Sequence, residues 1–388
     1  MLARELSDHA AESKVLWNLM LLEYYEDRNR EQAIAYGEQS LAIARQFDLQ
    51  EQLAYTLNDI ARAYFVVGKQ EQAWAAQKES NGLLRKLGIL SMLTDSLITS
   101  AGGHYFSGNF VEAQASAEEC VSVSKSIGSM WGQAVALYVL GAIYIENGEI
   151  SKSIDALQEA LPMAQQAGFA PPVTIRHRLA LFCGMFGDLE HGFEMAHKSI
   201  EAGDNRQFSL GAMAQLHLSS GNPGEADSAI QEALRELDNG ESDPKLGYAI
   251  FQVIESENAL ANHRYDEVLA LTERAISVLG EMGQRVFLPD LLRCRGEALL
   301  GLERSGEAKE ALAEALAVAE GQSSHRALWC ILPVLARIAA KDGPAAEAES
   351  LRRRAREAID YIADHAGTTE LRSGFLGSAK VRAFLKDL

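Results

Sequence analysis

The amino-acid sequence repeats a unit of about forty residues along almost its whole length. The stretch from Tyr55, YTLNDIARAYFVVGKQEQAWAAQKES, and the stretch from Tyr138, YVLGAIYIENGEISKSIDALQEAL, have the same order of features. Each contains an apolar helical run, a small residue, an aromatic residue three positions later and a glycine four positions beyond it. A second helix then opens with a small residue in its first turn. A fixed period of this length predicts a repeat architecture in which each unit packs only on its neighbours.

Three columns of small residues stay in phase along the chain. The first column, in the second helix of each unit, is Ala33, Ala73, Ala113, Ser153, Gly192, Ala226, Val268, Ala308 and Ala348. The second, seven residues later, is Ser40, Ser80, Cys120, Ala160, Ser199, Ala233, Ala275, Ala315 and Ala355. The third, in the first helix, is Ala61, Ala101, Gly141, Ala180, Ala214, Ser256, Gly296 and Ala336, with Leu21 as its exception. Two antiparallel helices approach closely only where the side chains at their crossing are small.

Turn residues divide these columns into helix pairs. We expect a positive φ, ending the first helix of a unit, at Gly68, Gly108, Gly148, Gly187, Gly221 and Gly343. The predicted units span residues 12–48, 50–88, 90–128, 129–168, 171–203, 205–240, 243–282, 286–320 and 323–366, followed by a C-terminal capping segment, 367–388. The fold class is therefore all-α, a right-handed α-solenoid of about nine helix pairs. The least regular stretch, Asn205–Ser242, is where we expect any bend.

The charge and cysteine content narrow the classes of partner. The chain has 54 acidic and 36 basic residues, a net charge of −18, which disfavours nucleic acid as a partner of this segment. The one basic cluster, residues 351–356, is flanked by glutamates and is interpreted as an ion-paired helix face. Four cysteines without C-x-x-C spacing fit a reducing cytoplasm. No stretch is apolar enough for a membrane helix, so no membrane partner is expected.

The best-preserved unit, Leu140-Gly141-x-x-Tyr144-x-x-x-Gly148 followed by Ser153 and Ala160, resembles the tetratricopeptide repeat. The longer unit resembles the variant found in the helical tails of bacterial signal-transduction ATPases, including regulators similar to the maltose-regulon activator. The opening segment SKVLWNLMLLEYYEDRNREQAIAYGEQSLAIARQFDLQEQLAYTLNDIARAY and the closing segment YIADHAGTTELRSGFLGSAKVRAFL resemble the two ends of such tails. The resemblance implies an attached NTPase or output domain, which this sequence does not contain.

Motifs that carry chemistry are missing from the sequence. There is no G-x-x-x-x-G-K-[ST], G-x-S-x-G or H-E-x-x-H, and His191 and His197, six residues apart, face opposite sides of a helix. The acidic residues mostly begin second helices, where they complement the helix dipole. We therefore predict no enzyme activity, no catalytic residue, no cofactor and no metal. An α/α-toroid enzyme, with a carboxylate pair at the mouth of a ring, is the least favoured alternative.

The first helix of each unit is expected to line the concave surface. The register places on that face a set of aromatic, amide and basic side chains suited to peptide capture. The predicted partner-binding residues are Asn18, Tyr25, Tyr55, Asn58, Arg62, Phe65, Tyr105, Tyr138, His177 and Arg293. Asn18 and Asn58 recur one unit apart, like the asparagines that hold peptide backbones in peptide-binding members of the fold. The same aromatic side chains would equally suit packing between neighbouring helix pairs.

Two functions follow from this pattern. In the first, the chain is the sensor or interaction arm of a multidomain bacterial signalling or transcriptional regulator, and a protein, a peptide or a small-molecule effector binds in the groove. In the second, it is a free-standing peptide-binding receptor or adaptor. The gene that encloses this sequence would separate them, because an upstream Walker motif favours the first.

Overall fold

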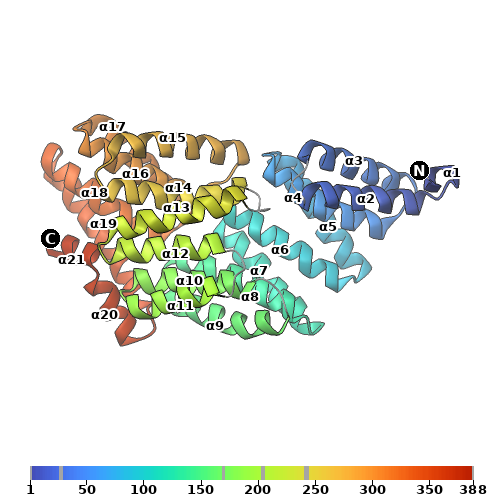
Figure 1. Ribbon diagram of the computed structural model, residues 1–388, viewed down its shortest axis with the longest axis horizontal. Helices are drawn as coiled ribbons and strands as arrows, with labels where there is room; N and C mark the ends of the chain where they lie inside the picture. Colours follow the sequence, from blue (N-terminus) through green and yellow to red (C-terminus); the bar gives the residue numbers. More distant parts are fainter. Residues whose placement is uncertain (1, 26–28, 168–170, 202–205, 240–243, 387–388) are drawn as a thin grey trace.

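The computed structural model describes residues 2–25, 29–167, 171–201, 206–239 and 244–386, and within these ranges every regular element is a helix. Figure 1 shows the helices running in antiparallel pairs that stack side by side. The first ten are α1 (Leu2–Glu5), α2 (His9–Tyr25), α3 (Arg30–Gln46), α4 (Gln50–Val66), α5 (Gln70–Leu87), α6 (Leu90–Phe106), α7 (Phe110–Ser126), α8 (Met130–Asn147), α9 (Ile150–Gln166) and α10 (Pro171–Met185). The next are α11 (Leu189–Glu201), α12 (Arg206–Ser219), α13 (Pro223–Asn239), α14 (Pro244–Ala261), α15 (Tyr265–Met282), α16 (Leu288–Gly301), α17 (Ser305–Gln322), α18 (His325–Asp342), α19 (Ala345–Asp364), α20 (Thr369–Gly377) and α21 (Ala379–Lys386). The all-α solenoid expected from the sequence is confirmed.

The small-residue columns are the contact points between helices. Every member of the first and second columns is buried, as is every small residue of the third. Gly141 shows why: a Cβ there would lie 2.7 Å from the side chain of Leu157, sixteen residues later. Gly296 meets Leu312 at the same separation in sequence, with its own Cβ position 2.5 Å away. Contacts this short leave no room for a larger side chain, so the repeat period of the sequence is the packing period of the structure.

Glycine ends the first helix where the sequence analysis placed it, with one exception. Gly148 caps α8 with φ +80°, and Gly68, Gly108, Gly187 and Gly221 also have positive φ. The expectation for Gly343 was wrong, because its φ is −121° and its ψ is −178°. Pro344 follows directly, and a residue before proline is driven into an extended conformation.

Polar side chains tie neighbouring pairs together at two fixed spacings. On the outer, odd-numbered helices, an arginine and a glutamate 34 residues apart form ion pairs between successive units: Arg45 with Glu79, Arg85 with Glu119, and Arg354 with Glu320. On the inner, even-numbered helices, hydrogen bonds join residues 36 or 37 apart, as between Asn58 and Asp95. The pairs of Arg354 with Glu320 and of Arg356 with Asp360 confirm the ion-paired interpretation of the basic cluster.

The even-numbered helices contact one another in series, α2 with α4, α4 with α6 and so on to α16 with α18, so they line the inner surface of the solenoid. The solenoid winds far enough for its later units to pack on earlier ones. The backbone N–H of Arg285 donates to the carbonyl of Phe106 at 2.7 Å, and that of Ser151 donates to the carbonyl of His365 at 2.9 Å. Gly68 lies against the carbonyl of Glu281, where a Cβ would clash. Units far apart in sequence therefore form one body.

The last two helices fold back onto the array (Figure 1). The ring of Phe375 in α20 lies 5.3 Å from that of Phe186, just after α10, and 5.6 Å from that of Trp329 in α18. Val381 and Phe384 of α21 are buried in the same cluster. Segment 367–388 as a cap, the listed unit bounds and a bend at Asn205–Ser242 stay predictions; residues 202–205 and 240–243 lie outside the described parts of the chain.

Candidate binding surface

The inner face of α2 carries a row of exposed side chains. Val15, Asn18, Leu22 and Tyr25 follow one another at spacings of three or four and so share one side of the helix. All four are exposed, Leu22 at 41% and Tyr25 at 62%. Two of the predicted partner-binding residues, Asn18 and Tyr25, therefore lie on an open surface.

A charged cluster on α4 and α6 continues this face. Arg62 forms ion pairs with two carboxylates: its Nη2 lies 2.5 Å from Asp95 Oδ2, and its Nη1 lies 3.1 Å from Asp59 Oδ1. Its Nε donates to Thr99 Oγ1 at 2.9 Å, and its Nη1 also donates to the Tyr25 hydroxyl at 3.3 Å. Arg62 thus connects three inner helices, α2, α4 and α6.

Asp59 has a carboxyl group that is costly to ionise. It is nearly buried, and Trp17 Nε1 donates to its Oδ2 at 2.8 Å. Burial raises the pKa of Asp59 to about 6; Arg62 and the Trp17 hydrogen bond lower it, and Asp95 raises it further. The single guanidinium does not offset the desolvation of this carboxylate. Sequence reasoning missed Asp59, Asp95 and Trp17.

Asn58 and Asn18 occupy equivalent register positions but different environments. Asn58 is fully buried; its Nδ2 donates to Asp95 Oδ2 at 2.6 Å, and its Oδ1 accepts from Gln77 at 3.4 Å. Asn18, by contrast, is exposed. The expectation that both asparagines face an open groove is corrected for Asn58, because its amide is already bonded inside the array.

Aromatic residues of the predicted set divide between surface and core. Tyr55 is half-buried and donates its hydroxyl to Glu51 at 2.6 Å; burial first, and then this bond, raise the pKa of Tyr55 to about 12. Phe65 packs edge-on against Trp74, with ring centres 4.8 Å apart, and Trp74 stacks on His104 at 4.0 Å. Phe65 is therefore largely a packing residue between helix pairs.

Tyr105 and Tyr138 surround a cation that sequence reasoning missed. The guanidinium of Arg178 in α10 lies 4.9 Å from the ring centre of Tyr138 and 5.9 Å from that of Tyr105, and its Nη2 donates to the Tyr138 hydroxyl at 3.2 Å. Tyr105 is buried, so the prediction that it is open to a partner is corrected. Arg178 follows Tyr138 by forty residues, which is one repeat period. This spacing could have identified Arg178 as a neighbour of Tyr138 from the sequence. The side chain of His177 lies outside the described residues.

Arg293 is a structural ion-pair residue and not an exposed contact. It is 5% exposed and pairs with Glu257 and, at 2.7 Å, with Glu297, while Gln215 donates to Glu257 at 2.6 Å. The prediction that Arg293 faces a partner is corrected, because carboxylates of α14 and α16 already satisfy its charge.

A second arginine, missed by sequence reasoning, joins the two windings of the solenoid. Arg326 lies 2.9 Å from Glu146 and 2.7 Å from Asp290, and Ser324 also donates to Glu146 at 2.9 Å. Arg326 and Glu146 are 180 residues apart in sequence. Despite burial, Arg326 first and then Arg293 hold the pKa of Asp290 below its usual value.

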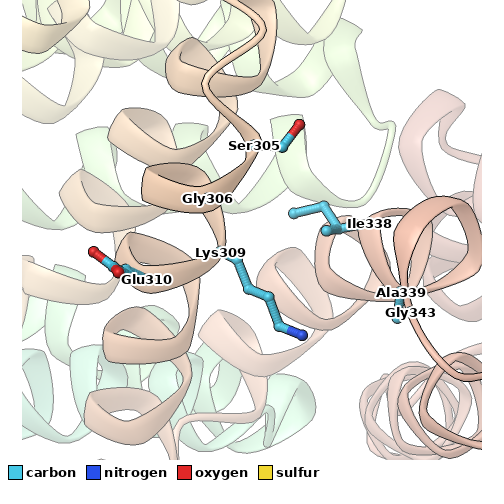
Figure 2. A pocket seen from close by; sticks show the side chains of 7 residues that line it. All are labelled: Ser305, Gly306, Lys309, Glu310, Ile338, Ala339 and Gly343. Atoms are coloured by element: carbon cyan, nitrogen blue, oxygen red, sulfur yellow. The ribbon is translucent and has the colours of Figure 1, made fainter.

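Other features offer no chemistry within the described residues. One surface hollow lies between α17 and α18, where Figure 2 shows Lys309 and Ile338 extending into the space and Glu310 pointing away. Lys309 is paired with Glu347 at 3.3 Å. No three His, Cys, Asp or Glu side chains gather as they would around a metal ion, and no helix is long and apolar enough to cross a bilayer, in the part of the chain that is described.

Comparison with known proteins gives the fold and no closer relationship. No family model matches the sequence, and no curated protein matches it significantly. The structure is similar to NprR in complex with its cognate peptide NprX, with a TM-score of 0.50 and 12% identity over 85% of this chain and 97% of that one. It is also similar to a tetratricopeptide repeat protein from Parabacteroides merdae ATCC 43184 (TM-score 0.35, 15% identity, 75% and 98% covered). A third similar structure is that of Cut9–Hcn1 from the APC/C (TM-score 0.45, 10% identity, 95% and 76% covered). The chain therefore has the tetratricopeptide-type solenoid fold.

Proposed function

We propose that this chain is a non-enzymatic scaffold that binds a peptide or protein segment on its inner surface. The observation that carries the proposal is the exposed inner face of α2, continued by the half-buried Tyr55 and Arg62 of α4. Apolar side chains held in a row on a rigid helix, beside a few polar groups, suit the capture of an extended or helical segment. A structure of the same fold, that of NprR, contains a bound peptide, which supports this use of the fold here.

The direct test is selection of peptides from a random phage-displayed library on the full chain, followed by calorimetry with the synthetic winners. Leu22→Asp should abolish their binding, because it places a charge in the middle of the exposed row. The matched control is Val111→Asp, which changes an even more exposed aliphatic residue on the outer helix α7. Failure to select any peptide, or equal loss of binding in both variants, contradicts the proposal.

We further propose that the scaffold is the sensor or interaction arm of a cytoplasmic signalling or transcriptional regulator, with an attached NTPase or output domain. The support is the resemblance of the two ends of the sequence to the helical tails of such regulators. A free-standing adaptor is the alternative. Reading the natural gene on both sides of this segment separates the two, since the first requires a nucleotide-binding motif in the same reading frame.

A further inference from the structure

The exposed row on α2 lacks the cover that other inner helices have. At the register of Tyr25, one and two units later, stand Phe65, which is half-buried against Trp74, and Tyr105, which is 6% exposed. Tyr25 is 62% exposed, although its hydroxyl already bonds to Arg62. The row therefore runs directly into the charged cluster, and a ligand that covers one contacts the other.

The charged cluster has more anionic than cationic groups. Asp59 and Asp95 share one guanidinium, that of Arg62. Within the described residues, the hydrogen bonds that Asp95 accepts, from Asn58 and from Arg62, both end on Oδ2, so Oδ1 is the oxygen left for a further donor. The side chain of Asp95 is 22% exposed.

The later inner helices contain a similar cluster of carboxylates and arginines, in which nearby cations offset the effect of burial on the carboxylate pKa values. There, burial raises the pKa of Glu257, but Arg293 and then Lys380 of α21 lower it, and the net shift is downward. Lys380 acts on Asp290 in the same direction, after Arg326 and Arg293. In the first cluster no such extra cation acts on Asp59, and its pKa is raised. The later cluster thus contains two arginines, Arg293 and Arg326, and a lysine beside an apolar segment, whereas Arg62 is the cation that acts on Asp59.

The segment that supplies this lysine combines a basic residue with apolar residues. In α21, Lys380 stays exposed while its neighbours Val381 and Phe384 are buried beside Trp329 of α18. A basic residue next to an aliphatic and an aromatic residue thus lies against the later units, within the electrostatic reach of three inner helices.

We propose that the inner surface of α2, α4 and α6 binds a peptide segment that carries a lysine or arginine between apolar side chains, with the cation on Asp95 and the apolar groups on Leu22 and Tyr25. This inference rests on the proposed peptide-binding function and names the class of partner. The Tyr25 ring adds a face on which the cation of the peptide can lie. The net charge of −18 favours approach of such a partner over an acidic one.

The test uses peptides selected on the full chain and one matched change on each side of the contact. We expect the selected peptides to share a basic residue, and its replacement by norleucine to weaken binding on the order of tenfold or more. Asp95→Asn should weaken the basic peptide by a similar factor and leave the norleucine peptide unchanged, as a double-mutant cycle requires for a direct contact. Glu118→Gln, which removes an exposed carboxylate from the outer helix α7, should change neither.

The outcomes separate this inference from the proposed function. The cationic contact is contradicted if the selected peptides lack a basic residue, or if Asp95→Asn does not change the affinity of a basic peptide. Either result leaves the proposed peptide binding intact. Selection of no peptide at all overturns both. The norleucine peptide needs no protein variant, and thermal melting of Asp95→Asn shows whether its effect is on binding or on folding.

The pH dependence gives an independent readout. Asp59 faces Arg62 and Asn58 on its own helix, Asp95 on α6 and Trp17 on α2. A bound cation that restores an ordinary pKa to Asp59 makes the affinity at pH 5 about tenfold lower than at pH 7.5, since Asp59 must lose its proton. An affinity that is flat over this range contradicts the involvement of Asp59.

Discussion

The inner surface near α2 and the inner surface near α16 use the same register positions in different ways. Around α16, the arginines pair with carboxylates of neighbouring inner helices and of the earlier units, and the pKa values of Glu257 and Asp290 are lowered. Around α2 and α4 the apolar row is exposed and the pKa of Asp59 is raised. The same repeat geometry therefore produces either a buried core or an exposed surface. The difference depends on whether other parts of the chain pack over the inner helices.

The largest effect should come from breaking the closed region. Arg326→Ala leaves Glu146 and Asp290 without their common partner in a buried site, and we expect a loss of about 3–5 kcal/mol in the free energy of unfolding, measured in urea. The control is Arg354→Ala, which removes an exposed pair with Glu320 and should lose less than about 1 kcal/mol. Similar losses in the two variants would show that the ion pairs of Arg326, which join early and late units of the solenoid, add no stability.

The contact between windings can be isolated with two glycines. Gly68 and Gly88 both have positive φ, but a Cβ at Gly68 would clash with the carbonyl of Glu281, whereas a Cβ at Gly88 meets open space. Gly68→Ala should therefore lower the unfolding free energy by about 1–3 kcal/mol more than Gly88→Ala. Because backbone strain is matched, equal losses would mean that the two windings do not touch at this point in solution.

In the exposed region, we expect Asp59 to make a smaller, pH-dependent contribution to the free energy of unfolding. Its pKa is about 6 when folded and has its ordinary value when unfolded, so its contribution to stability is fully present below pH 4 and is lost as pH rises through 6. Between pH 5 and 7.5 this loss amounts to about 1.4 kcal/mol. The free energy of unfolding is measured in urea at the two pH values for the wild type and for Asp59→Asn. Subtracting the two pH dependences removes the contribution of the other titratable groups. A variant with the same pH dependence as the wild type would disprove the raised pKa.

The repeat period made the fold predictable, because every small residue in the columns lies at a helix crossing. It also predicts two of the missed site residues: Arg178 follows Tyr138 by 40 residues, and Asp95 follows Asn58 by 37, one period less a helical turn. The pair of Arg326 and Glu146, 180 residues apart, could not be predicted this way, since the winding of the solenoid is set by many small rotations between units. The exposure of individual residues could not be predicted from the sequence either, because equivalent repeat positions differ only in which other residues pack over them.

The smallest effect on stability, and the sharpest test of the comparison, is at Tyr25. Tyr25→Ala removes a ring that is 62% exposed, that packs edge-on against Tyr24 and whose hydroxyl accepts from Arg62. Because most of this ring faces solvent, we expect the unfolding free energy to change by less than about 0.5 kcal/mol. Tyr105→Ala, at the same register two units later, removes a buried ring and should lose about 3–5 kcal/mol. Binding of a selected peptide should respond in the opposite order, with Tyr25→Ala weakening it while the fold stays intact. If Tyr25→Ala instead unfolds the first pair, its ring is a packing residue like that of Tyr105, and the two inner surfaces are alike.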